Sequence, residues 1–158
     1  MTTEEKKPSA LEARLAEDLK QAMRDKNVVA RETLRMLKAE ILREQVKVDD
    51  PNDPQTEVDE LAIVLRAVKT RRDSVADYEK GGRAELAANE LAEIEVLSKY
   101  LPKAMDDDEA RAALRAIAAE LGITQKKQLG QLMKVVNERH RGALEGARAS
   151  KLAGEFLS

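Results

Sequence analysis

The sequence predicts an all-α protein in which an N-terminal four-helix unit is joined to a compact three-helix C-terminal domain. Apolar residues recur at steps of three and four along most of the 158-residue chain, which is the period of one face of an α-helix. Helix-start and helix-stop residues separate these stretches, and strand signals hardly appear. The apolar content of 42% supports a packed interior, and the charged content of 37% is typical of amphipathic helices with solvated outer faces.

The first two helices are predicted between Ser9 and the segment 49–54. Ser9 followed by Glu12 forms a capping box, and apolar residues then repeat at four-residue steps: Leu11, Leu15, Leu19 and Met23. Asn27 can cap a second helix, whose buried side is marked by Leu34, Leu37 and Ile41. The segment 49–54 contains two prolines and must end this helix.

Two further helices complete the N-terminal unit. Thr56 is predicted to open the third, which carries an apolar side of Leu61, Val64, Leu65, Val68 and Val75. The Gly81-Gly82 pair supplies the permissive backbone of a helix stop. The fourth helix runs from about Ala84 to Pro102, with apolar residues at Leu91, Ile94, Leu97 and Leu101. Proline cannot continue a helix, so we expect an N-terminal helical domain over residues 1–102.

The remaining residues, 103–158, are predicted to form the three-helix domain. Asp106 and Glu109 make a capping box for its first helix, which stops at Gly122. Thr124 can cap the next helix, and Gly142 ends it. A last helix carries Leu152 and Phe156 toward the C-terminus.

The C-terminal third of the chain is basic although the whole chain has a net charge of −2. Residues 110–158 contain nine Lys and Arg against four Glu, a formal charge of +5. In the predicted sixth helix, one face is apolar, with Leu129, Leu132, Met133 and Val136, and the opposite face is polar, with Lys127, Gln131, Lys134, Glu138 and Arg141. The polar face taken alone suits an ordinary solvated surface, whereas the regional charge favours a polyanion partner.

RNA is the polyanion that we expect, because each Lys or Arg that neutralises a phosphate releases condensed counterions. The chain has no Trp, and its aromatic residues are Tyr78, Tyr100 and Phe156. Contacts should therefore be made to phosphate, sugar and shape rather than by stacking on bases. The predicted RNA-binding residues are Lys127, Lys134, Arg139, Arg141 and Lys151.

Catalytic, metal and cofactor sites are not expected. There is no cysteine, which excludes disulfides and thiolate metal sites, and His140 is the only histidine, for which a packing role is favoured. No phosphate-binding glycine loop is visible. Carboxylate pairs such as Glu40/Glu44 arise routinely in a chain with thirty acidic residues. A second basic group, with Arg66, Lys69, Arg71 and Arg72, is interpreted as surface ion pairs with nearby Asp residues.

The chain is predicted to be cytoplasmic, with neither a membrane nor DNA as a partner. Its first residues have no apolar core of the kind that a signal peptide needs. No apolar run approaches the length of about 18 residues at which a membrane span becomes plausible.

Over nearly its whole length the sequence resembles the small bacterial YqeY-like proteins of the GatB/YqeY family. In the N-terminal part the matching segments are residues 34–39, 69–74 and 95–102. In the C-terminal part the matching residues are Gly130, Met133, Arg139, Arg141, Gly142, Gly146, Lys151 and Leu152. Glu138, Ala143 and Glu145 depart from the usual Pro, Arg and Asp of the family.

The resemblance implies a C-terminal domain similar to the tail of the B subunit of tRNA-dependent amidotransferase, which contacts tRNA in the enzyme that amidates Glu-tRNA(Gln) or Asp-tRNA(Asn). The resemblance also implies carbon-nitrogen ligase activity with glutamine as amido-N-donor. Such chemistry needs an activated nucleophile and a nucleotide site, and neither is visible, so we expect no catalysis from the chain alone. The leading interpretation is an accessory module that binds tRNA or another structured RNA. The alternative is a protein-interaction module that docks on an amidotransferase, a synthetase or another RNA-handling complex without binding RNA itself.

Overall fold

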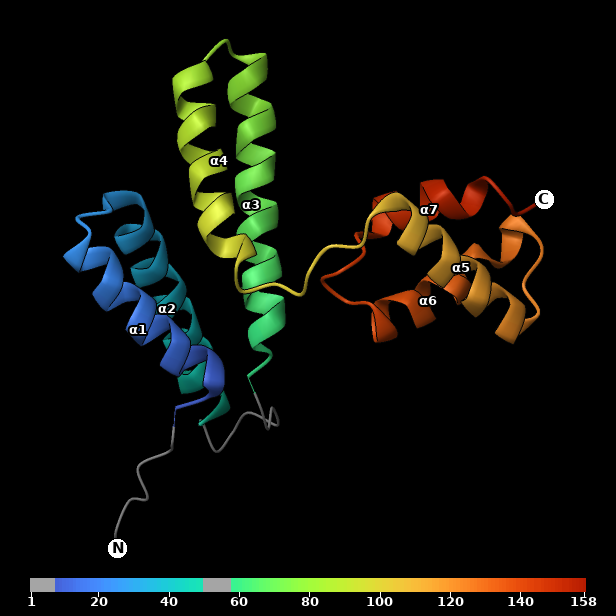
Figure 1. Cartoon of the computed structure of the whole chain (residues 1–158), viewed down its shortest axis with the longest axis horizontal. Helices are drawn as coiled ribbons and strands as arrows, with labels where there is room; N and C mark the ends of the chain where they lie inside the picture. Colours follow the sequence, from blue (N-terminus) through green and yellow to red (C-terminus); the bar gives the residue numbers. More distant parts are fainter. Residues whose placement is uncertain (1–7, 50–57) are drawn as a thin grey trace, which may run out of the picture. The chain divides into compact units, whose positions relative to one another are not determined.

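The described residues, 8–49 and 58–158, fold into seven α-helices and one short 3-10 helix, with no strand among them (Figure 1). This is a computed structural model, and it confirms the all-α prediction. The chain divides into two compact units, residues 1–100 and residues 101–158.

Four helices make up the first unit: α1 (Ala10–Arg24), α2 (Val28–Val48), α3 (Glu60–Lys80) and α4 (Ala84–Ser98). α1 and α2 form one hairpin and α3 and α4 form another, and α2 packs against both α3 and α4 (Figure 1). α2 therefore makes the main helix contacts between the two hairpins, and the Ser9 hydroxyl at the start of α1 adds a hydrogen bond to Glu60 of α3 at 2.7 Å.

The helix starts in this unit follow local signals. The Ser9 hydroxyl accepts the Glu12 N–H at 3.1 Å, which is one half of the predicted capping box. The Asn27 side chain accepts the Ala30 N–H at 3.1 Å, as predicted. Asp59 caps α3, while Thr56, the predicted opening residue, lies outside the described residues. These side-chain acceptors satisfy backbone donors that have no partner inside a helix.

The core of the first unit contains about half of the apolar positions that were expected on buried sides. Buried side chains on α2 and α3 include Leu34, Leu37, Ile41, Val64, Val68 and Val75. Met23 and Leu91 were expected on buried sides, but they are 52% and 50% exposed. Leu91 is separated from the buried Leu97 by two three-residue steps. These steps place the two side chains about 120° apart around α4. A three-residue step therefore does not keep two side chains on one narrow stripe.

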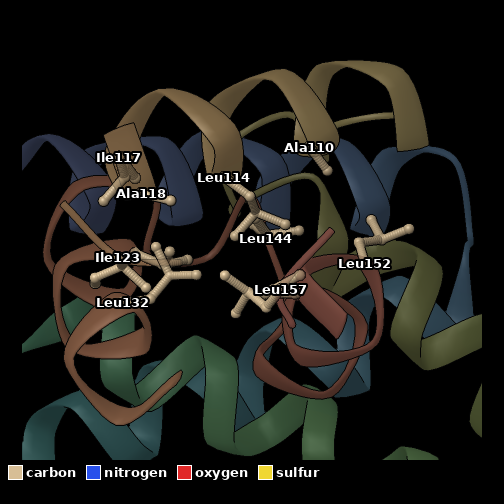
Figure 2. Close-up of a cluster of buried hydrophobic side chains, with 12 residues drawn as sticks. Ala110, Leu114, Ile117, Ala118, Ile123, Leu132, Leu144, Leu152 and Leu157 are labelled. Atoms are coloured by element: carbon tan, nitrogen blue, oxygen red, sulfur yellow. The ribbon is translucent and has the colours of Figure 1, made fainter. Parts of the chain in front are cut away.

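The second unit contains α5 (Asp107–Leu121), the 3-10 helix η1 (Lys126–Gln128), α6 (Leu129–Arg139) and α7 (Gly146–Gly154). The three α-helices all contact one another. Figure 2 shows their shared core, to which α5 contributes Ala110, Leu114, Ile117 and Ala118, while later segments contribute Ile123, Leu132, Leu144, Leu152 and Leu157.

Helix α5 begins and ends as predicted. The Asp106 carboxylate accepts the Glu109 N–H at 2.8 Å, and this backbone hydrogen bond is the main reason that the pKa of Asp106 is lowered. Gly122 ends the helix with φ +69°, a left-handed conformation that favours glycine.

Helix α6 is shorter than predicted at both ends. Thr124 does not cap it, because η1 intervenes and the Gln128 side chain accepts the Thr124 N–H at 3.1 Å. At the other end α6 stops at Arg139 with His140 as its half-buried C-cap, and Gly142 lies in the following turn with φ +83°. The Lys126 N–H, which a Thr124 cap could bind, donates instead to the Ser158 carbonyl at 2.9 Å.

Candidate functional site

The clearest candidate site in the second unit consists of Lys126 and Lys127 on η1 and Lys134 on α6, which we call the basic strip. All three side chains are exposed. None of them forms a side-chain hydrogen bond or an ion pair with any residue between 8 and 49 or between 58 and 158. Their ammonium groups are therefore available to an external anion.

The backbone beneath the basic strip is held by the end of the chain. The Lys126 N–H donates to the Ser158 carbonyl at 2.9 Å, and the Ser158 N–H donates to the Thr124 carbonyl at 3.0 Å. The Gln125 and Gln128 side chains form a reciprocal capping box on η1. The lysines consequently extend from a backbone that is fixed on both sides.

The exposed face of α6 continues the basic strip. Gln131, Lys134 and Glu138 are three and four residues apart, so they share one side of the helix, and all three are exposed. Glu138 adds a negative charge toward the end of this face. The positive charge is thus concentrated at the η1 end.

Arg139 is engaged inside the protein. Its guanidinium donates two hydrogen bonds to the Glu120 carboxylate, each at 2.7 Å, which joins α6 to α5. These hydrogen bonds lower the pKa of Glu120 and raise that of Arg139. A phosphate could contact Arg139 only in exchange for this bidentate pair.

The two other predicted RNA-binding residues lie on different segments. Arg141 is exposed in the turn after α6, so it does not continue the helical face that carries Lys134. Lys151 is exposed on α7, and the nearby Glu155 has a pKa lowered mainly by a hydrogen bond from Arg111 and to a smaller extent by Lys151. The structure therefore places the predicted residues on η1, on α6, in the turn after it and on α7.

Several other cations of this unit are used in internal contacts. Arg111 pairs with Glu155 at 2.9 Å, and Arg148 bonds to Asp107 at 3.0 Å. The guanidinium of Arg115 lies 5.7 Å from the centre of the Phe156 ring, in cation–π contact. The formal charge of the region thus overstates the charge that is available to a ligand. The prediction from the sequence omitted Lys126, although it directly precedes the predicted Lys127.

The second basic group, on α3, is only partly a set of surface pairs. Lys69 pairs with Asp73 at 2.9 Å within the helix, as the surface interpretation expects. For Arg71 that interpretation is wrong, because its side chain is 8% exposed and donates to Glu93 of α4 at 2.8 Å. Spacing could have identified this residue, since Arg71 follows Val68 by three positions and precedes Val75 by four on the buried side.

The residues of the described ranges include no group of three or more His, Cys, Asp or Glu that could hold a metal ion. Among their helices, none is both long enough and apolar enough to cross a membrane.

Comparison with known proteins gives a match over nearly the whole sequence. The family model described as Yqey-like protein matches residues 12–157. A protein of Vanderwaltozyma polyspora, "Altered inheritance of mitochondria protein 41, mitochondrial", is 32% identical over 90 residues, 55% of this chain and 46% of the relative. A protein of the same name from Clavispora lusitaniae is 32% identical over 102 residues, 63% of this chain and 58% of the relative. The chain therefore spans about half the length of these curated relatives.

Proposed function

The chain belongs to the Yqey-like protein family, and on that premise we propose that it is an accessory module that binds tRNA or another structured RNA. The observation that supports this most is the basic strip, in which Lys126, Lys127 and Lys134 are exposed and unpaired within the described ranges while neighbouring arginines are engaged in internal contacts. Exposed lysines on a fixed backbone can neutralise phosphates without losing an internal ion pair. Binding would then follow the shape of the RNA backbone rather than its bases.

The physical basis of the proposal is counterion release. Three phosphate contacts correspond to a log-log slope of affinity against salt of about −2 to −3. Arg141 and Lys151 would add to this slope if the RNA reaches the turn after α6 and the surface of α7. Arg139 would add to it only by leaving Glu120.

The experiment is a titration of bulk tRNA with the full chain at several salt concentrations. The Lys126→Glu/Lys127→Glu/Lys134→Glu variant is expected to bind at least about tenfold more weakly and with a flatter salt slope. The matched control is Lys38→Glu/Lys80→Glu/Lys99→Glu, which makes the same change of net charge at exposed positions of the first unit. Equal loss in both variants would indicate a general charge effect, and no binding of wild type at low salt would reject the proposal.

A second candidate is docking on an amidotransferase, a synthetase or another RNA-handling complex, without RNA binding by this chain. The exposed apolar side chains of α2, among them Met36, Leu42 and Val46, favour a protein contact in the first unit. Capture of such a partner that survives nuclease treatment, together with no tRNA binding, would support this candidate over the first.

Catalysis by the chain alone is not part of the proposal. The ligase label of the family would require a glutamine-hydrolysing nucleophile and a nucleotide site in the same assembly. Glutamine-dependent amidation of mischarged tRNA by the purified chain with ATP would overturn this view.

A further inference from the structure

Helix α2 is apolar on two opposite sides, although only one of them is buried. Leu34, Leu37 and Ile41 are 3%, 1% and 3% exposed and pack into the core of the first unit. Five residues after each of them, about 140° around the helix, stand Ala39, Leu42 and Val46. All three are exposed, Leu42 by 51% and Val46 by 71%. Exposed apolar side chains that gather on one side of a helix mark a contact surface, so the second side calls for a partner.

This second side runs the full length of α2. We define the outer face of α2 as the exposed apolar residues Val28, Val29, Met36, Ala39, Leu42 and Val46. Beside it lies a cavity of about 740 Å³, to which α2 contributes Met36, Leu42 and Val46 and α3 contributes Arg66 and Thr70. The outer face is thus bordered by a hollow that can receive side chains from another molecule.

The outer face also carries charged residues, of which Glu32 and Arg43 lie at similar distances on either side of its centre. Glu32 lies in the N-terminal half of α2, where Arg31 and Arg35 contact its carboxylate at 3.0 and 3.3 Å. Arg43 lies in the C-terminal half, and both Glu32 and Arg43 are exposed. Arg43 lines the cavity and makes no ion pair with any residue of the described segments. Side-by-side pairing of two α2 helices in the same direction would place Glu32 against Glu32 and Arg43 against Arg43. Pairing in opposite directions would place each Glu32 near the Arg43 of the other chain, twice.

From this arrangement we propose that the outer face of α2 binds a second copy of the chain in antiparallel orientation, related by a two-fold axis. A two-fold contact uses the same surface on both subunits, which requires such self-complementarity. The positions 28, 32, 35, 39, 42 and 46 alternate steps of four and three, the spacing of a helix seam in two-stranded packing. Four of these positions are apolar, and the other two carry Glu32 and Arg35. Val28 of each chain then lies near Val46 of the other, and Met36 and Ala39 lie close to the axis.

The first measurement is the mass of the full chain in solution over a range of micromolar concentrations, by sedimentation or light scattering. A dimer is expected in wild type. Leu42→Lys/Val46→Lys should raise its dissociation constant by about 100-fold, because two apolar side chains lose their burial. Both residues are exposed in the single chain, so its helicity and melting temperature should not fall. The matched control is Leu91→Lys on α4, also 50% exposed, which should leave the dimer unchanged.

The second measurement tests orientation and uses the absence of native cysteine. Val28 and Val46 are separated by about 27 Å along α2, too far for a disulfide between equal positions of antiparallel helices. Under oxidation, an equimolar mixture of Val28→Cys and Val46→Cys chains should form the mixed disulfide, while each variant alone should not crosslink.

The charge pair gives a third, reversible test. Glu32→Arg and Arg43→Glu should each weaken the dimer, and Glu32→Arg/Arg43→Glu in one chain should restore it. A monomer at all concentrations would overturn the proposal, whether the outer face is then open or covered by another part of the chain or by a foreign protein. A dimer that resists Leu42→Lys/Val46→Lys, or one that crosslinks equal positions, would overturn it as well.

Discussion

The ion pair between Arg71 and Glu93 offers the sharpest test of how the first unit is held together. Arg71 of α3 donates from Nε to the Glu93 carboxylate at 2.8 Å and from a terminal nitrogen to the Ala67 carbonyl at 3.0 Å. Its other terminal nitrogen meets only the weak acceptor Sδ of Met36 at 3.8 Å. The guanidinium therefore contacts three of the four helices of the unit.

The cost of breaking this pair depends on which charge is left behind. Removing one partner of a buried pair costs about 3–5 kcal/mol, because the other charge stays in a poorly solvated place. The Arg71 side chain is 8% exposed and that of Glu93 is 28% exposed. We expect Arg71→Met to cost only about 2–3 kcal/mol, since water reaches Glu93, and Glu93→Met to cost about 3–4 kcal/mol, since it leaves Arg71 unpaired. Arg71→Met/Glu93→Met should lie within about 1 kcal/mol of wild type.

Urea unfolding followed by tyrosine fluorescence measures these differences. Both tyrosines, Tyr78 and Tyr100, belong to the first unit, so the signal reports on this unit and not on the second. Additive costs in the double variant, or a larger cost for Arg71→Met than for Glu93→Met, would refute the reasoning.

Three further predictions concern the second unit and are measured by circular dichroism. Gly122→Ala should cost about 1 kcal/mol, because φ is +69° while the space around a new Cβ is open. Asp106→Ala should cost about 1 kcal/mol through loss of the α5 cap at the Glu109 N–H. Arg139 lowers the pKa of Glu120 below its ordinary 4.5, so the stabilisation is present above about pH 5 and is lost as pH falls through the folded pKa. Glu120→Gln should accordingly lower the melting temperature at about pH 7, and this effect should shrink as the pH falls below the ordinary pKa of 4.5.

Local signals in the sequence were sufficient for most helix limits. Ser9, Asn27 and Asp106 cap their helices as expected, and Gly122 ends α5, because each acts on backbone groups within four residues. The failure at Thr124 has no local origin, because the Lys126 N–H that it could cap donates to the carbonyl of Ser158 at the end of the sequence. A backbone contact between residues that are so far apart in the sequence is not visible in a period of apolar residues.

The charged contacts could not be predicted in the same way. Arg139 and Glu120 are 19 residues apart, and Arg71 and Glu93 are 22 apart, so their pairing depends on how helices pack. A count of charges treats these arginines like Lys134, which has no such partner in the described structure. The RNA-binding role of the five predicted residues stays a prediction: Lys127, Lys134, Arg139, Arg141 and Lys151. Of these, Lys127 and Lys134 belong to the basic strip and are the first candidates, because their side chains make no internal ion pair in the described structure.

The basic strip belongs to the second unit and the outer face of α2 to the first, and a dimer would couple the two. A dimer joined through α2 would carry two basic strips, and binding of one strip to an RNA would raise the effective concentration of the other. Leu42→Lys/Val46→Lys should then weaken tRNA binding although it adds two positive charges, provided that both strips reach the same RNA. If the variant binds tRNA more tightly than wild type, the added charge alone governs affinity, and each strip acts independently.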